Sequence, residues 1–165
     1  MDTIIIPVQR KIKASEKMLR GIMIALAVLF LLQGILLSRS FMLPCLLMAG
    51  LAIWYSVTIR REFEYILEEG WIRIYRVNDR GRFLQHEFSM EDIVALATPE
   101  DPAVAAYRKG GSEKIRKFDY TSYQENVPYY TMIVAKDGTR IKLLLDLTRE
   151  AIERIRRANR TAVHC

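Results

Sequence analysis

Two long uncharged stretches dominate the first third of the chain. Residues 21–38 contain one strongly polar side chain, Gln33. In residues 41–59 only Ser56 and Thr58, near the end, interrupt the apolar stretch. As helices rising 1.5 Å per residue, each stretch would cover about 27–29 Å, close to the roughly 30 Å of bilayer hydrocarbon. A helix that is apolar on all sides has no face for water. The remaining residues are too few to bury two such helices, so the pattern predicts two membrane spans.

The short connection between these stretches predicts an antiparallel helical hairpin with both outer ends on one side. The link consists of Ser38, Arg39 and Ser40, so it carries one cation. Seven cations flank the outer ends: Arg10, Lys11, Lys13, Lys17, Arg20, Arg60 and Arg61. Because cytoplasmic flanks are enriched in Lys and Arg, we expect a multi-pass protein of the plasma membrane with both termini in the cytoplasm.

Two other interpretations of the apolar stretches exist. A cleaved signal peptide is disfavoured because residues 21–38 exceed a usual apolar signal core and a second apolar stretch follows at once. A hairpin that enters the membrane without crossing it stays open, because both stretches are short.

The basic lead, residues 1–20, also allows two interpretations. It joins Ile4, Ile5, Ile6 and Val8 to a stretch of cations. From Gln9 onward it could form an interfacial helix with its cations on anionic headgroups. We favour the simpler interpretation, in which these charges only fix the orientation of the hairpin.

The remaining residues, 60–165, alternate between short apolar runs and turn signals. Turn residues such as Glu69-Gly70 and Lys136-Asp137-Gly138 separate runs that are typical of strands. The seven expected strands are residues 62–68, 71–77, 82–88, 93–97, 114–120, 129–135 and 139–145. Residues 148–160 predict a C-terminal helix with Thr148 as its N-cap. Consecutive antiparallel hairpins followed by one amphipathic helix favour a small barrel or sandwich that the helix closes at one end.

This layout resembles the pleckstrin-homology-like (PH-like) fold. The residues that carry the resemblance are Val8-Gln9-Arg10-Lys11, Glu62-Phe63-Glu64-Tyr65, Gly70-Trp71-Ile72-Arg73-Ile74 and Leu145 through Ile155. The whole chain is similar to small, largely uncharacterised bacterial membrane proteins in which a basic lead and two transmembrane helices precede a cytosolic PH-like domain. The resemblance implies an α+β membrane protein: a two-helix transmembrane hairpin (21–59), then an antiparallel PH-like β-barrel or sandwich of about seven strands with a C-terminal capping helix (60–165). It also implies binding of lipid headgroups or proteins rather than catalysis, and it supplies no site residues.

Composition and motifs narrow the function classes further. An apolar content of 51% excludes disorder, and two cysteines, Cys45 and Cys165, exclude a disulfide scaffold. The only histidines, His86 and His164, have no metal-ligand spacing, and phosphate-loop and nucleophile-elbow signatures are absent. We therefore expect no enzyme, no catalytic residue, no metal site and no cofactor. An enzyme with a site too dispersed to recognise is the disfavoured alternative.

The basic residues give the one candidate site. Residues 60–165 carry 19 Lys and Arg against 17 Asp and Glu, a balance that argues against nucleic acid as a partner. Seven cations flank one hairpin, the long loop and the fifth strand, and they are candidates for contact with anionic lipid: Arg80, Arg82, Arg108, Lys109, Lys114, Arg116 and Lys117. An ordinary mixed-charge surface is the alternative.

Two functional hypotheses follow. In the first, the hairpin anchors a non-enzymatic binding or scaffold module at the cytoplasmic face of the bilayer, where it engages a protein, a copy of itself or anionic lipid. In the second, the chain is an accessory subunit of a larger membrane transporter or envelope complex and docks through its helical hairpin.

Overall fold

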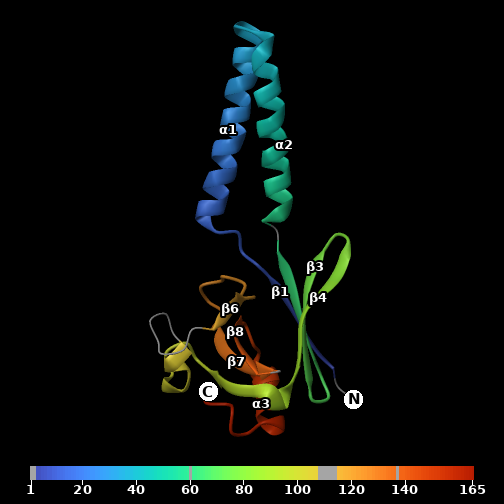
Figure 1. Ribbon diagram of the computed structural model, residues 1–165, viewed down its shortest axis with the longest axis vertical. Helices are drawn as coiled ribbons and strands as arrows, with labels where there is room; N and C mark the ends of the chain where they lie inside the picture. The colour runs from blue at the N-terminus through green and yellow to red at the C-terminus, as the bar shows by residue number, and fades with distance from the viewer. Residues whose placement is uncertain (1–2, 60, 108–114, 137) are drawn as a thin grey trace. The chain divides into compact units, whose positions relative to one another are not determined.

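The chain divides into a helical unit and a β-rich unit (Figure 1). The computed structural model describes residues 3–59, 61–107, 115–136 and 138–165. The helical unit comprises Lys11–Arg61, and the β-rich unit comprises Met1–Arg10 together with Glu62–Cys165. In sequence, the helical unit is therefore an insertion between two segments of the β-rich unit.

The helical unit is a hairpin of two packed helices, as the apolar stretches predict. Helix α1 (Ala14–Leu36) leads through the short 3₁₀ helix η1 (Arg39–Phe41) to α2 (Met42–Thr58). The backbone N–H of Lys13 donates to Glu16 Oε2 at 3.0 Å where α1 begins. Thus α1 starts well before the uncharged stretch and includes the cations at its N-terminal end.

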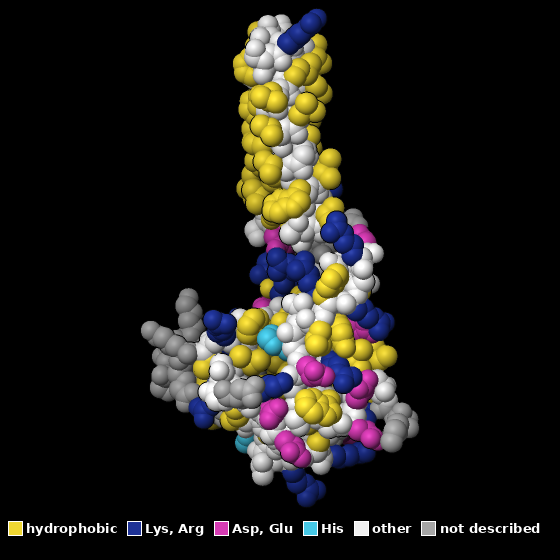
Figure 2. Space-filling model, turned by 45° about the vertical axis from the view of Figure 1, so that its right-hand side comes forward, with side chains coloured by type: hydrophobic (Ala, Val, Ile, Leu, Met, Phe, Trp, Pro, Cys, Tyr) yellow, Lys and Arg dark blue, Asp and Glu magenta, His cyan; other side chains and the backbone are white. Residues whose placement is uncertain are grey.

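The surface of the hairpin is apolar. Figure 2 shows hydrophobic side chains over most of the visible face of this unit, and only 11% and 6% of the most apolar windows of the two helices are buried. The hydroxyls of Ser56 and Thr58 donate to the carbonyls of Ala52 and Trp54 at 2.6 and 2.9 Å, so these donors are satisfied within α2. Helix α1 and the continuous segment Arg39–Thr58, formed by η1 and α2, are each long and apolar enough to cross a membrane.

The first sheet contains four antiparallel strands in the order β1-β2-β3-β4. Their bounds are β1 (Ile4–Gln9), β2 (Glu62–Glu68), β3 (Trp71–Asn78) and β4 (Gly81–Ser89). Alternation along β2 turns Phe63, Tyr65 and Leu67 toward the core. Gly70, at φ +76°, closes the β2–β3 turn in a conformation that favours glycine.

Strand β1 is a difference from the seven strands expected from sequence. Residues 4–9 pair antiparallel with β2, from Ile4 opposite Leu67 to Gln9 opposite Glu62, and Ile6 and Val8 are buried. The interfacial helix considered from Gln9 onward does not form there, because Gln9 ends β1 and α1 begins only at Ala14. The apolar part of the basic lead is thus an edge strand of the β-rich unit.

The second sheet has the order β5-β7-β8-β6. Its strands are β5 (Ile93–Ala97), β6 (Arg116–Asp119), β7 (Tyr130–Lys136) and β8 (Thr139–Leu145). Strands β5, β7 and β8 pair antiparallel, but β6 pairs parallel to β8. The expectation of consecutive antiparallel hairpins is therefore wrong for β6, which reaches the far edge of the sheet through the long segment that follows β5. The short 3₁₀ helix η3 (Pro102–Tyr107) lies within that segment.

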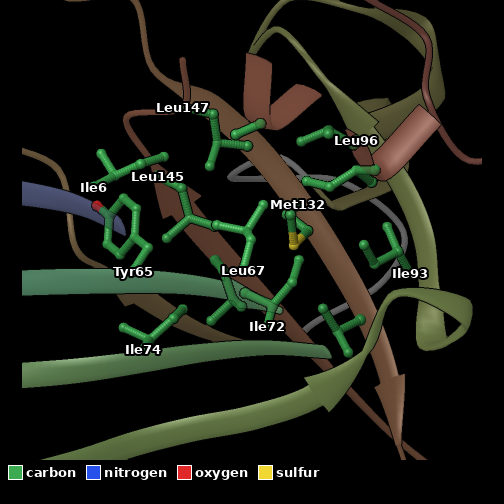
Figure 3. Packing of buried hydrophobic residues seen from close by; sticks show 14 of the residues in the cluster. Ile6, Tyr65, Leu67, Ile72, Ile74, Ile93, Leu96, Met132, Leu145 and Leu147 are labelled. Carbon is green, nitrogen blue, oxygen red and sulfur yellow. The ribbon is translucent and has the colours of Figure 1, made fainter. Parts of the chain in front are cut away.

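The two sheets enclose one hydrophobic core. Figure 3 shows Tyr65, Leu67 and Ile72 of the first sheet packing with Met132 and Leu145 of the second. Within the described residues the chain forms eight strands in two separate four-stranded sheets. Of the barrel and the sandwich that the sequence leaves open, the structure has the sandwich, with one strand more than the seven expected.

Helix α3 (Arg149–Ala158) closes one end of this core, as expected for residues 148–160. Thr148 Oγ1 accepts from the backbone N–H of Ala151 at 3.3 Å, which confirms the predicted N-cap. Ala151, Ile152 and Ile155 are buried in the core. The chain then returns along the edge of β5.

Two short pieces of the chain complete this end of the unit. Ser89 caps the 3₁₀ helix η2 (Met90–Asp92), and the side chain of Asn159 donates to the carbonyls of Met90 and Ile93 at 3.2 and 3.0 Å. Leu96 donates to the carbonyl of Ala162 at 2.7 Å, and the N–H of His164 donates back to Leu96 at 2.9 Å. The C-terminal residues thus cover part of a sheet edge that would otherwise present unpaired backbone groups.

Candidate functional site

The turn of the β3–β4 hairpin lies at the same end of the first sheet as the two points where the chain leaves for the helical unit and returns from it. The register places Gln9, Glu62, Val77 and Arg82 in one row across the four strands. The chain leaves the sheet after Gln9 and returns at Glu62, whereas β3 and β4 continue by one more pair and a turn. Figure 1 shows this hairpin extending from the body of the sheets. We call residues 79–84 the hairpin tip.

The hairpin tip combines cations with two uncovered apolar side chains. Phe83 is 49% exposed and Leu84 is 50% exposed. Because neighbouring strand residues point to opposite faces, both faces of the tip are apolar and open. Arg82 Nε lies 3.0 Å from Glu64 Oε2, with the Arg82 side chain 58% exposed and that of Glu64 9% exposed. Arg80 makes no hydrogen bond or ion pair within the part of the chain that the structure describes.

The other predicted lipid-contact residues lie elsewhere. Arg116 and Lys117 are exposed on β6, an edge strand of the second sheet. Arg108, Lys109 and Lys114 lie outside the described residues. The described candidate cations therefore form two pairs, one on each sheet: Arg80 and Arg82 at the hairpin tip, and Arg116 and Lys117 on β6.

Arg10 is the centre of a contact network that the sequence analysis did not identify. Its Nη2 donates to the Tyr123 hydroxyl at 2.5 Å and to the Asp119 carbonyl at 2.9 Å, and it lies 3.3 Å from Asp119 Oδ1. The guanidinium carbon is 4.0 Å from the Tyr123 ring centroid and 5.5 Å from that of Phe63. The Arg10 side chain is only 10% exposed. It thereby fastens the end of β1 to the segment that follows β6.

Two carboxylates hold that segment in place. Asp119 Oδ1 accepts from the backbone N–H and the hydroxyl of Thr121 at 3.2 and 2.8 Å. Asp146 Oδ2 accepts from the N–H of Ser122 at 2.7 Å, and Asp146 is buried. These carboxylates act as acceptors for a folded loop, so their geometry supports a structural role rather than acid–base chemistry.

An aromatic cluster lies between the two sheets beside this loop. Phe63 and Tyr120 pack edge to face with centroids 5.0 Å apart, and His86 packs edge to face on Phe118 at 4.5 Å. Burial lowers the pKa of His86 and raises the pKa of Tyr120 to about 12. His86 lies on the edge strand β4, and its ring contacts are with Phe118 and Tyr120.

Tyr65 connects the core to the same loop. Its hydroxyl donates to the Tyr120 carbonyl at 2.7 Å, and its side chain is fully buried. Burial, followed by the negative charge of Asp146, raises the pKa of Tyr65 far above its ordinary value. The Tyr65 hydroxyl is therefore a neutral donor that positions the loop backbone.

The opposite end of the β-rich unit carries a basic depression on α3. Glu153, Arg156, Arg157 and Arg160 line this shallow depression, and Arg156 also donates to the carbonyl of Cys165. The depression lies at the far end from the hairpin tip, because η2, which packs on α3, bonds through Met90 N–H to the β2–β3 turn at Gly70.

No candidate metal site is assembled in the described ranges 3–59, 61–107, 115–136 and 138–165. Within them no three His, Cys, Asp or Glu side chains gather in a way that could hold a metal ion. Cys45 and Cys165 are both free thiols. Glu64, one of two glutamates on the same face of β2, pairs with Arg82.

Comparison with known proteins assigns the family. A family model described as a bacterial PH-like domain (DUF6106) matches residues 6–164. The match begins within β1 and runs through both apolar helices to the last residues of the β-rich unit, so the helical insertion is part of the family's layout. No curated protein and no solved structure matches the chain. PH-like domains are generally binding modules without catalytic activity. The chain belongs to the bacterial PH-like domain family DUF6106.

Proposed function

We propose that this protein is a membrane-anchored, non-enzymatic binding module. The hairpin α1–α2 crosses the plasma membrane twice and holds the PH-like domain at the cytoplasmic face. The observation that carries the proposal is the exposed apolar surface of the hairpin, which is about nine-tenths unburied over its most apolar windows. Apolar surface of this extent is unfavourable in water and favourable in lipid.

The distribution of cations supports the cytoplasmic orientation. Lys11, Lys13, Lys17 and Arg20 lie at or just before the start of α1, and Arg61 follows α2. The connection between the helices carries Arg39 alone. Because Lys and Arg are retained on the cytoplasmic side, this asymmetry supports a cytoplasmic position for the outer ends of both helices and for the PH-like domain.

The PH-like domain then serves as the recognition part. It offers two exposed basic surfaces at its opposite ends, the hairpin tip and the α3 depression. A protein partner or a second copy with an acidic surface fits the α3 depression by charge, whereas an anionic membrane surface fits the hairpin tip. Binding of a protein and contact with lipid are thus compatible functions of one domain.

Fractionation and reporter fusions test the anchoring. The intact chain should stay in the membrane pellet after alkaline carbonate extraction and move to the supernatant only with detergent. A fluorescent reporter that folds in the cytoplasm should be active when fused after Cys165, while alkaline phosphatase at the same place should be inactive. Release by carbonate, or an active phosphatase fusion, would overturn the proposed anchoring or its orientation.

A second candidate function is docking of the hairpin itself to a larger transporter or envelope complex. It is favoured by the open surfaces of α1 and α2, which suit another membrane protein as well as lipid. Replacement of residues 14–58 by an unrelated two-helix hairpin separates the candidates, with crosslinked partners from native membranes as the readout. Retained partners assign recognition to the PH-like domain, and lost partners assign it to the hairpin.

A further inference from the structure

We propose that the hairpin tip is a second membrane contact, in which Phe83 and Leu84 enter the interface of an anionic bilayer and Arg80 and Arg82 bind its headgroups. The inference rests on the proposed anchoring and adds a lipid-binding surface of the PH-like domain. It follows from three features of the chain: the length of the linkers, the register of the first sheet and the chemistry of the tip.

The linkers restrict how far the first sheet can lie from the membrane. Four residues separate Gln9 from Ala14 at the start of α1, and three separate Thr58 at the end of α2 from Glu62. A chain spans at most about 3.6 Å per residue, so the linkers reach no further than roughly 14–18 Å. Two such linkers leave from neighbouring strands at one end of the sheet, so this end can lie no further than their length from the ends of the two helices.

The register places the hairpin tip at this same end. Val77 and Arg82 lie in the row of Gln9 and Glu62, and β3 and β4 extend beyond it by the pair Asn78–Gly81 and the turn. Among the described strands of the first sheet, the β3–β4 hairpin therefore projects furthest past the points where the chain crosses toward the helices. The β2–β3 turn, at the other end, is one strand length away.

The chemistry of the tip fits an anionic interface. Phe83 and Leu84 are each about half exposed on opposite faces of the hairpin, so no sheet covers either side chain. An amphipathic surface binds the membrane interface because its apolar side chains are buried there and its cations are attracted to anionic headgroups. Arg80 is unpaired within the described residues, and Arg82, although paired with Glu64, remains 58% exposed. Asp79 is the one opposing charge in the tip.

The contact would fix the orientation of the PH-like domain. With the linkers and the hairpin tip all held at the bilayer, the α3 depression at the far end of the domain points into the cytoplasm. This leaves Arg156, Arg157 and Arg160 open to a soluble partner. One domain would thus use its near end for lipid and its far end for protein.

A fluorescent label at the tip of the full-length protein tests the contact. The background carries Cys45→Ser and Cys165→Ser, because these are the native thiols. Phe83→Cys is labelled with an environment-sensitive dye, and the protein is reconstituted into nanodiscs of phosphatidylcholine with or without phosphatidylglycerol. Trp71→Cys is the matched control, since Trp71 is 44% exposed and lies at the opposite end of β3.

In the anionic discs we expect the emission of the dye at position 83 to be blue-shifted and to be quenched by spin-labelled lipid. The dye at position 71 should keep the emission it has in water. Arg80→Gln should lower the ratio of inserted to free tip about fivefold, because one cation at an anionic surface is lost. Arg116→Gln, which removes an exposed cation of the second sheet, should leave this ratio unchanged.

Several results would overturn the inference. If the protein enters the discs but the dye at position 83 emits as it does in water, the contact is excluded and the anchoring stands. If the protein does not enter the discs, the anchoring itself is contradicted. Equal signals at positions 71 and 83, or equal effects of Arg80→Gln and Arg116→Gln, would assign the attraction to diffuse charge. A dye that responds to added protein but not to lipid would make the tip a protein-binding surface.

Discussion

The guanidinium carbon of Arg10 lies 4.0 Å from the centre of the Tyr123 ring, and Arg10 Nη2 donates to the hydroxyl of the same residue at 2.5 Å. Tyr123 has φ +58°, the only positive φ among the described non-glycine residues. A left-handed backbone at a residue with a Cβ costs roughly 1–2 kcal/mol, so the contacts of the Tyr123 side chain must compensate for it. Arg10, which ends the first segment of the β-rich unit, thus stabilises a loop more than a hundred positions later.

Arg10→Ala should therefore destabilise the PH-like domain. The substitution removes two charge-assisted hydrogen bonds, one ion pair and the stacking on Tyr123, and we expect a loss of about 2 kcal/mol in the free energy of unfolding. Arg10→Lys should recover less than half of that loss, because an ammonium group has no planar face to stack on the Tyr123 ring. Urea unfolding of the detergent-solubilised protein, followed by Trp71 fluorescence in a Trp54→Phe background, measures both.

Arg80→Ala is the matched control for Arg10→Ala. It removes an arginine that is exposed and unpaired in the described part of the chain, so its effect should stay within about 0.5 kcal/mol. Equal losses for the two variants would contradict a special role for Arg10.

Tyr65→Phe should change how stability depends on alkaline pH. The pKa of Tyr65 is raised in the folded state above its ordinary value of 10.0, so the folded protein holds this proton longer than the unfolded chain. Stability from this group is complete below about pH 10 and is lost as pH rises further, at about 1.4 kcal/mol per pH unit. The variant should lose about 1 kcal/mol at neutral pH with its hydrogen bond to Tyr120 and should then show a shallower decline above pH 10.

The measurement is the free energy of unfolding at several pH values between neutrality and pH 12. Tyr120, with a pKa raised to about 12, should leave part of the alkaline decline in the variant. Parallel pH profiles for the variant and the wild type would show that Tyr65 does not hold its proton in the folded state.

Much of this fold could be predicted from local patterns in the sequence. Alternation and turn residues located the strands from β2 to β8, and the apolar stretches located α1 and α2. Strand β1 was missed because Ile4-Ile5-Ile6 does not alternate and Pro7 interrupts it, and its partner β2 follows only after the helical insertion. The parallel pairing of β6 with β8 was missed for a related reason, since a local pattern carries no information about a distant partner.

The candidate site was only partly predictable. Charge and turn signals gave seven candidate cations, among them Arg80 and Arg82 at one hairpin, and did not distinguish these two from the others. Phe83 and Leu84 could not be predicted as exposed apolar residues. Strand alternation assigns one of two neighbouring residues to a core, but at this hairpin tip both side chains stay about half exposed. From the sequence, Arg10 was counted among the cations that orient the helical hairpin. Its contacts with Asp119 and Tyr123 exist only in the folded chain.

The stability of the helical hairpin α1–α2 should be sensitive to side-chain size at Gly34. A Cβ at Gly34 would lie 3.1 Å from Met42 Sδ, whereas one at Gly50 would have no atom within 4 Å. Gly34→Leu should therefore destabilise the packing of α1 on α2 by about 1–3 kcal/mol. Gly34→Ala should be tolerated, because the flexible Met42 side chain can move by a few tenths of an ångström.

Gly50→Leu is the control, because it makes the same gain in helix propensity without the contact. Titration with sodium dodecyl sulfate, followed by Trp54 fluorescence, reports the stability of the hairpin. Equal midpoints for Gly34→Leu and Gly50→Leu would contradict close packing at Gly34.

His86 should make the PH-like domain less stable in mild acid. Burial against Phe118 and Tyr120 lowers the pKa of His86 below its ordinary value of 6.5, so the unfolded chain binds the proton first as pH falls. Stability from the neutral imidazole is complete above pH 6.5 and is lost below it, until the folded-state pKa is reached. His86→Phe keeps an aromatic ring in the cluster and removes the titration, so its stability relative to the wild type should rise as pH falls below 6.5. His86→Gln also removes the titration but loses the ring contacts, so it should show the same flattened pH profile at lower stability throughout. An acid response that persists in both variants would assign the effect to other groups, whereas its loss in both would assign it to the imidazole of His86, which is neutral where it packs on Phe118 and Tyr120.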